Sequence, residues 1–104
     1  MTKKYFFFDI DGTLGLGISS IIPADTLYCL RRLVQEGHFI AIASGRLQHD
    51  TQTFADRYGI PAVVADGGNS LSLDGKVLEM TDLPLENCKA LLRDLTARHY
   101  PWAV

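Results

Sequence analysis

The sequence has little that marks a secreted, membrane-bound or nucleic-acid-binding protein. Only two of the 104 residues are cysteines, which allows one disulfide at most, and we expect Cys29 and Cys88 to be buried free thiols. The formal net charge is −2 and the basic residues are scattered, which excludes a nucleic-acid footprint or a polybasic membrane anchor. No apolar run approaches the roughly 18 residues of a membrane span. Asp9 and Asp11 also interrupt the apolar N-terminus before it reaches signal-peptide length. We therefore expect a cytoplasmic protein with neither nucleic acid nor membrane as partner.

Hydrophobic residues make up 47% of the chain, which is enough to build a core in one domain. The apolar runs at 5–8, 39–43 and 61–65 predict three strands, the first of them buried on both faces. Helical spacing of apolar residues at 23–37 and 45–59 predicts a helix in each gap. This βαβαβ order predicts a parallel sheet with right-handed crossovers.

The pattern changes after the third strand. Residues 70–80 alternate around Asp74-Gly75, which predicts a β-hairpin. A third helix is predicted at 84–99, and its apolar face consists of Leu85, Cys88, Leu91, Leu92 and Leu95.

Polar residues follow each predicted parallel strand, where ligands bind in open α/β sheets. Asp9 and Asp11 follow the first strand, and their side chains should point the same way because strand side chains repeat every second residue. Two carboxylates this close repel each other unless a cation lies between them. A hard divalent cation with oxygen ligands, such as Mg²⁺, would satisfy this condition, whereas Asp-Gly alone would indicate only a turn.

Ser44, Gly45 and Arg46 follow the second strand. The Ser44 hydroxyl and the N–H groups at the start of the next helix could hold a phosphate, or Ser44 could be a simple helix N-cap. Arg46 could reach an anionic substrate or remain solvated. Asp66 ends the third strand, where it could serve function or only the turn.

The segments "FFFDIDGTL" and "IAIASGR" resemble the first two motifs of the haloacid dehalogenase (HAD) superfamily of phosphohydrolases. The Ser-Gly-Arg form resembles the sugar-phosphate and cofactor phosphatases, whose cap domain follows the third core strand. This resemblance implies a three-layer Rossmann-like parallel α/β core at 1–80 and the beginning of a cap domain at 81–104. That subgroup usually has Asn-Gly-Ala where this chain has Asp66-Gly67-Gly68.

The resemblance implies a Mg²⁺-dependent phosphatase that hydrolyses a small phosphorylated metabolite, such as a sugar phosphate, through an aspartyl-phosphate. Asp9 would be the nucleophile and Asp11 the acid/base, and both would bind the metal, Asp11 through its backbone carbonyl. We expect the neighbouring aromatic residues to raise the pKa of the Asp11 carboxyl. The residues implied in binding the substrate and its phosphate are Asp11, Gly12, Ser44, Gly45 and Arg46.

Two later motifs of the superfamily, a lysine and an acidic metal-binding pair, should follow the cap and do not occur in these residues. We therefore expect the N-terminal part of a longer protein, with little activity by itself. The strand at 5–8 would then be a bare edge that favours self-association. The alternatives are a phosphomutase of the same superfamily, a receiver-like signalling domain phosphorylated on Asp66, and a fragment that only binds metal.

Overall fold

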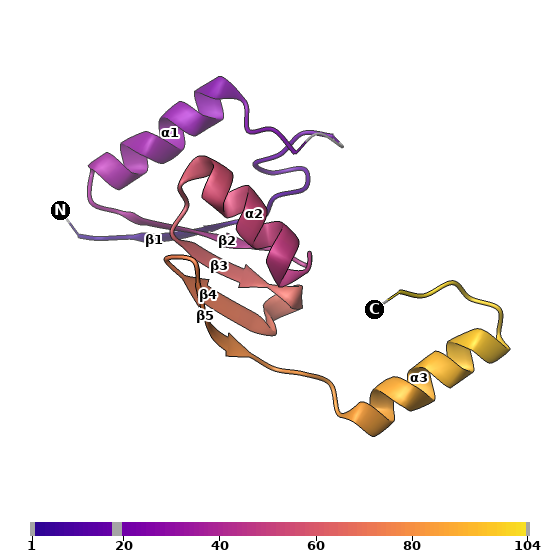
Figure 1. The fold of residues 1–104 in the computed structure, drawn as a ribbon. Coiled ribbons are helices and arrows are strands. Elements are labelled where there is room, and N and C mark those ends of the chain that lie inside the picture. The colour runs from indigo at the N-terminus through magenta and orange to yellow at the C-terminus, as the bar shows by residue number, and fades with distance from the viewer. Residues whose placement is uncertain (1, 18–19, 104) are drawn as a thin grey trace.

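The computed structural model describes residues 2–17 and 20–103, which form a five-stranded sheet and three α-helices (Figure 1). The order along the sheet is β1 (Tyr5–Phe8), β2 (Phe39–Ala43), β3 (Ala62–Ala65), β4 (Ser70–Leu73) and β5 (Lys76–Met80). Strands β1 to β3 are parallel, and β4 and β5 are antiparallel to their neighbours. The helices are α1 (Ala24–Gln35), α2 (Gln48–Tyr58) and α3 (Leu85–Ala97), with a 3₁₀ turn η1 (Asp66–Gly68) after β3. The predicted α/β Rossmann-like class, the hairpin and the third helix are confirmed.

Backbone conformation explains where two of these elements end. Helix α2 stops at Gly59, whose φ of 67° lies in the left-handed region that suits glycine. The β4–β5 hairpin turns through Asp74 and Gly75, with φ values of 51° and 77°. Positive φ at both central residues is the requirement of a tight type I′ turn, which matches the twist of the flanking strands.

The core lies between the sheet and the two helices that connect its parallel strands. Consecutive right-handed crossovers running in one direction place both helices on the same face, and both contribute to one buried cluster (Figure 1). The cluster consists of Ile10, Leu14, Ile22, Leu30, Ile40, Ile42, Phe54, Ala55, Ile60, Val63 and Ala65. Phe7 of β1 and Leu73 of β4 point to the opposite face and are exposed. The described residues therefore cover one face of the sheet.

The prediction that β1 is buried on both faces is wrong. Phe6 and Phe8 pack against the core, but Tyr5 and Phe7 remain 62% and 59% exposed. The reason is topological: β1 is the edge strand, paired with β2 on one side, and its second face has no covering helix among the described residues.

Helix α3 lies away from the sheet in Figure 1, and none of its residues is buried. Strand β5 is likewise exposed throughout. Cys29 and Cys88 are free thiols, as predicted, but Cys29 is exposed and Cys88 only half-buried. Within the described part of the chain, no helix is long and apolar enough to cross a membrane.

We expect the 104-residue chain, expressed alone, to self-associate through the free edge of β1. An edge strand presents unpaired N–H and C=O groups, and here they lie beside exposed Tyr5 and Phe7. Sedimentation velocity at rising protein concentration should reveal dimers or larger species, and Phe7→Lys should reduce them because charge on an edge opposes strand pairing.

Leu73→Lys is the matched control, since Leu73 is exposed on the same face of the sheet but belongs to the inner strand β4. Equal effects of the two substitutions would assign association to the apolar face and not to the edge. A clean monomer of the unsubstituted chain would contradict the prediction altogether.

Candidate active site

The turn after β1 is fixed by two buried residues between polar ones. Ile10 and Leu14 are buried in the core, so the carboxylates of Asp9 and Asp11 must lie outside it. The backbone closes the turn through hydrogen bonds from Leu14 N–H to the Asp9 carbonyl (3.3 Å) and from Gly15 N–H to the Ile10 carbonyl (2.8 Å). Gly12 has a φ of 79°, which favours glycine at this position. The motif is thus a rigid turn that presents two acids.

The loop after β2 is a turn of its own and not a helix start. The Ser44 hydroxyl accepts a hydrogen bond from the backbone N–H of Arg46 at 3.0 Å. Helix α2 begins only at Gln48, with Leu47 as its N-cap. Both the N-cap interpretation of Ser44 and the prediction that it directly precedes a helix are therefore wrong. The hydroxyl is an acceptor within the loop, and its own hydrogen remains available to a ligand.

Backbone hydrogen bonds join this loop to the one after β3. Asp66 N–H donates to the Arg46 carbonyl at 2.8 Å, and Gly67 N–H donates to the Ser44 carbonyl at 3.3 Å. Asp66 itself has a φ of 53°, uncommon for a residue with a side chain. The second and third strand ends therefore form one connected structure.

A crevice of about 400 Å³ opens where the three strands end, as expected for the carboxyl ends of a parallel sheet. Its lining residues are Asp9, Ala43, Ser44, Gly45, Val64, Gly67 and Gly68. The structure thus brings Asp9, Ser44 and Gly45 together as the sequence predicts. The Asp9 carboxylate thus faces a serine and three glycines, small residues that leave room for a tetrahedral anion to approach a nucleophile.

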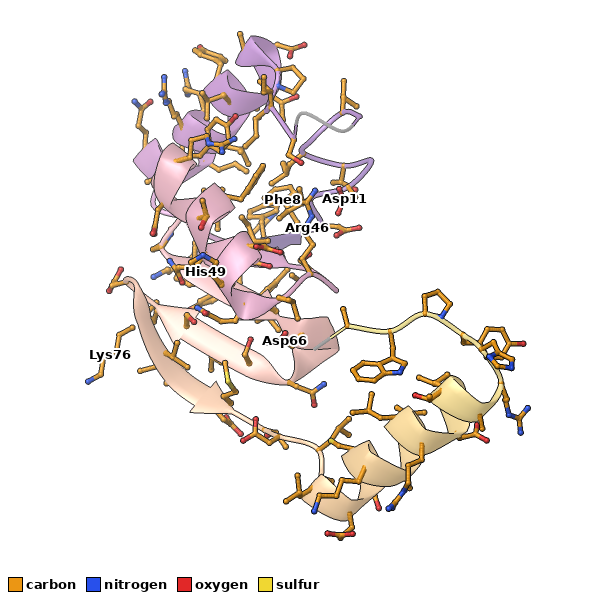
Figure 2. All side chains as sticks on the ribbon, turned by 45° about the vertical axis from the view of Figure 1, so that its right-hand side comes forward. Phe8, Asp11, Arg46, His49, Asp66 and Lys76 are labelled. Atoms are coloured by element: carbon orange, nitrogen blue, oxygen red, sulfur yellow. The ribbon has the colours of Figure 1, made fainter. Side chains whose placement is uncertain are left out.

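Asp11 is turned toward Arg46 and does not line this crevice (Figure 2). Arg46 Nε donates to Asp11 Oδ2 at 2.8 Å, and Nη2 donates to Oδ1 and also to the Ser20 hydroxyl at 2.8 Å. The positive group that two neighbouring carboxylates require is therefore present in the protein itself. The sequence does not predict the contact between Ser20 and Arg46, because the segment "GLGISS" contains no motif that indicates a site residue.

The pKa of the Asp11 carboxyl is lowered, chiefly by its hydrogen bonds with Arg46. The prediction of a raised pKa is wrong for this structure, because the Asp11 side chain is 58% exposed and the aromatic residues of β1 do not enclose it. The pKa of Arg46 is raised in turn, mainly by its hydrogen bond with Asp11. Both groups are held in their charged forms.

The oxygens at the end of β1 fit part of a Mg²⁺ site. Carboxylates and backbone carbonyls are ligands that this ion prefers. Two carbonyls of the turn, those of Asp9 and Ile10, already accept backbone hydrogen bonds. Within residues 2–17 and 20–103, however, no three His, Cys, Asp or Glu side chains gather closely enough to hold a metal ion. Asp9 and Asp11 would supply only a share of the ligands.

Asp66 lies in a second cavity of about 560 Å³, together with His49 and Cys88. After β3 the chain continues into η1 and the β4–β5 hairpin. A receiver-like domain would need a helix there, so the fold does not support phosphorylation of Asp66 as the function.

These features define an α/β protein of Rossmann-like topology, with an Asp-x-Asp-Gly-Thr turn at the crevice where its three parallel strands end. Residues 6–104 match the family model described as haloacid dehalogenase-like hydrolase. The chain belongs to this family, and the resemblance inferred from its motifs is confirmed.

Several known proteins resemble the chain over most of its length. It is 29% identical over 96 residues to the 5-amino-6-(5-phospho-D-ribitylamino)uracil phosphatase YwtE of Bacillus subtilis (strain 168), covering 92% of this chain. A solved structure from Geobacillus kaustophilus HTA426 has a TM-score of 0.79 and 34% identity over 94% of this chain. BT4131, described as a HAD subclass IIB sugar phosphatase, has a TM-score of 0.74 and 29% identity over 93% of this chain.

These relatives are longer than the chain. It spans 33% of YwtE and 38% of each of the two solved chains. The shared part is the region that carries the acidic turn, the crevice and the hairpin.

Replacing Arg46 by Gln should raise the pKa of the Asp11 carboxyl toward its ordinary value, because the guanidinium that stabilises the carboxylate is removed. The ¹³C resonance of the Asp11 carboxyl, followed by NMR during a pH titration in metal-free buffer, reports this change directly. Arg32→Gln is the control, since Arg32 pairs with Glu36 and should leave Asp11 unaffected. An unchanged Asp11 titration in Arg46→Gln would contradict the assigned cause.

Proposed function

We propose that the protein containing this chain is a Mg²⁺-dependent phosphatase that hydrolyses a small phosphorylated metabolite through an aspartyl-phosphate. The observation that carries the proposal is the position of Asp9, which lies at the carboxyl end of β1 and lines the crevice with Ser44 and Gly45. Membership of the hydrolase family supports the reaction class.

In the first step, a carboxylate oxygen of Asp9 attacks phosphorus, and the bond from phosphorus to the leaving-group oxygen breaks. Ser44 and the backbone of Gly45 contact the remaining phosphate oxygens from the walls of the crevice. To supply a proton to the departing oxygen, the Asp11 carboxylate must first take one up and free an oxygen from Arg46, which holds it ionised in this structure.

In the second step, Asp11 accepts a proton from water as the water oxygen attacks phosphorus. The acyl phosphate bond then breaks, which frees inorganic phosphate and restores the Asp9 carboxylate. Splitting the hydrolysis in this way lets two residues on one turn serve both halves of the reaction.

Mg²⁺ would be held by the Asp9 carboxylate and the Asp11 carbonyl, together with ligands outside this chain, and would offset the repulsion between Asp9 and the phosphate. The hard oxygens at this turn support that choice. Because the chain itself contributes so few of them, we expect the 104 residues alone to bind the ion weakly and to show near-background phosphatase activity.

We propose that the substrate is a sugar phosphate or a similar small phosphate ester. YwtE and BT4131 are described as phosphatases of a phosphoribityl compound and of sugars, which supports this class. We also propose that residues 1–80 belong to the catalytic core and 81–104 begin a cap domain. The absence of buried residues in α3 and its distance from the sheet in Figure 1 support this division.

Asp9→Asn in the complete protein should reduce kcat by at least about a thousandfold, because an amide is a poor nucleophile. Asp25→Asn is the control, since Asp25 is exposed in the first turn of α1 and does not line the crevice. Phosphate release from 4-nitrophenyl phosphate measures both. Wild-type kcat in the Asp9 variant would refute the assignment.

Asp11→Asn should slow turnover severely but still allow slow phosphorylation of Asp9 by 4-nitrophenyl phosphate. Its leaving group departs without a proton, so the first step needs no acid. A burst of nitrophenol on rapid mixing measures this step. If the Asp9 and Asp11 variants lose the first step to the same degree, the acid role of Asp11 is wrong.

Chelation of divalent ions should abolish the activity of the complete protein, and Mg²⁺ should restore it. Ca²⁺ should restore little, because its larger radius and looser coordination place the phosphate poorly for in-line attack. Steady-state assays after dialysis against a chelator provide the test, and full activity in the chelator would rule out the metal.

A further inference from the structure

Arg46 belongs to the loop after β2 and makes hydrogen bonds to the segments that follow β1 and β3. Its backbone N–H donates to the Ser44 hydroxyl, and its carbonyl accepts from Asp66 N–H. Its side chain reaches Asp11, 35 residues earlier, and Ser20, 26 residues earlier. The backbone hydrogen bonds fix the position of the Arg46 main chain, and the hydrogen bond to Ser20 helps to fix the position of the guanidinium.

The guanidinium uses one complete edge on Asp11. Nε and Nη2 donate to the two carboxylate oxygens, the forked geometry that also binds phosphate or a substrate carboxylate. Nη2 donates in addition to Ser20. With this edge engaged, Arg46 does not present it to an incoming anion, and Arg46 is not among the residues that line the crevice.

We infer that Arg46 is a positioning residue, which fixes the plane and location of the Asp11 carboxyl, with Ser20 as the anchor of the guanidinium. This inference rests on the proposed function and reassigns Arg46, which the sequence suggested as a substrate ligand.

The chemical reason lies in the direction of the reaction. In-line attack by Asp9 expels the leaving oxygen on the side of phosphorus opposite Asp9, and the acid role of Asp11 requires its carboxyl to reach that oxygen. An exposed aspartate on a turn would otherwise sample several rotamers, and misplacement of a proton donor by about 1 Å can cost a hundredfold in rate. A lysine cannot replace the arginine, because its ammonium is a single point of charge that fixes no plane.

The test compares Arg46→Lys, Arg46→Gln and Ser20→Ala in the complete protein, using phenyl phosphate and 4-nitrophenyl phosphate. Phenol leaves poorly without a proton, whereas nitrophenol leaves easily. Both Arg46 variants should lose at least about tenfold more kcat on phenyl phosphate than on 4-nitrophenyl phosphate, with KM within about twofold of wild type. Ser20→Ala should show the same selectivity to a smaller degree.

Arg57→Gln is the matched control. Arg57, in α2, lines a third cavity of about 390 Å³ together with Arg46 and Ser20. Among the described interactions it makes no contact with Asp11. It should leave both substrates unaffected. A large KM increase in the Arg46 variants with kcat preserved would make Arg46 a substrate ligand and overturn the inference. Equal losses on both substrates, or no losses, would also overturn it.

An NMR measurement separates this inference from the proposed function. The Arg46 Nε–H resonance should shift on Asp11→Asn and on Ser20→Ala, whether or not the protein turns over phosphate esters. An unchanged resonance would overturn the positioning role even in an active enzyme. Absence of turnover by the wild type, with the resonance responding as expected, would instead refute the proposed function. Thermal unfolding of each variant confirms that it folds.

Discussion

The pairing of Arg46 with Asp11 is the interaction on which the candidate site depends. Asp9 and Asp11 are two carboxylates on one short turn, separated by one residue. The guanidinium from the neighbouring loop holds Asp11 charged and turned aside. Asp9 is thereby left as the carboxylate that faces the crevice. One ion pair thus gives chemically identical side chains different surroundings, the condition for giving them different roles.

Much of the fold follows from local patterns in the sequence. Strand β2 has the predicted boundaries, α2 ends at Gly59, the last residue of the range predicted for that helix, and the hairpin turns at Asp74-Gly75. Those signals act within a few residues and need no knowledge of tertiary structure. The prediction that β1 is buried on both faces failed because burial depends on which strands and helices lie next to a strand. An apolar run has the same sequence pattern at the centre of a sheet and at its edge.

The same difference between local signals and tertiary contacts separates the site residues that the sequence predicts from those that it does not. Asp9, Ser44 and Gly45 meet because the carboxyl ends of adjacent parallel strands always share an edge, and topology alone predicts this. The contact of Arg46 with Asp11 and Ser20 depends on the rotamers of a long side chain that crosses from one loop to another. Sequence spacing fixes no such direction. For the same reason, the aromatic residues close to Asp11 in the sequence suggested an enclosed carboxyl, although the side chain is largely exposed and paired with Arg46.

The bonds between the loops after β2 and β3 also set the order in which the site can form during synthesis. Ser44 and Arg46 receive hydrogen bonds from Gly67 and Asp66, so the crevice has both walls only once the ribosome has released residue 68. Among the described residues, the hairpin strands and α3 contribute nothing to the lining of the crevice. A nascent chain can therefore bring the lining residues together before the hairpin and α3 have been synthesised.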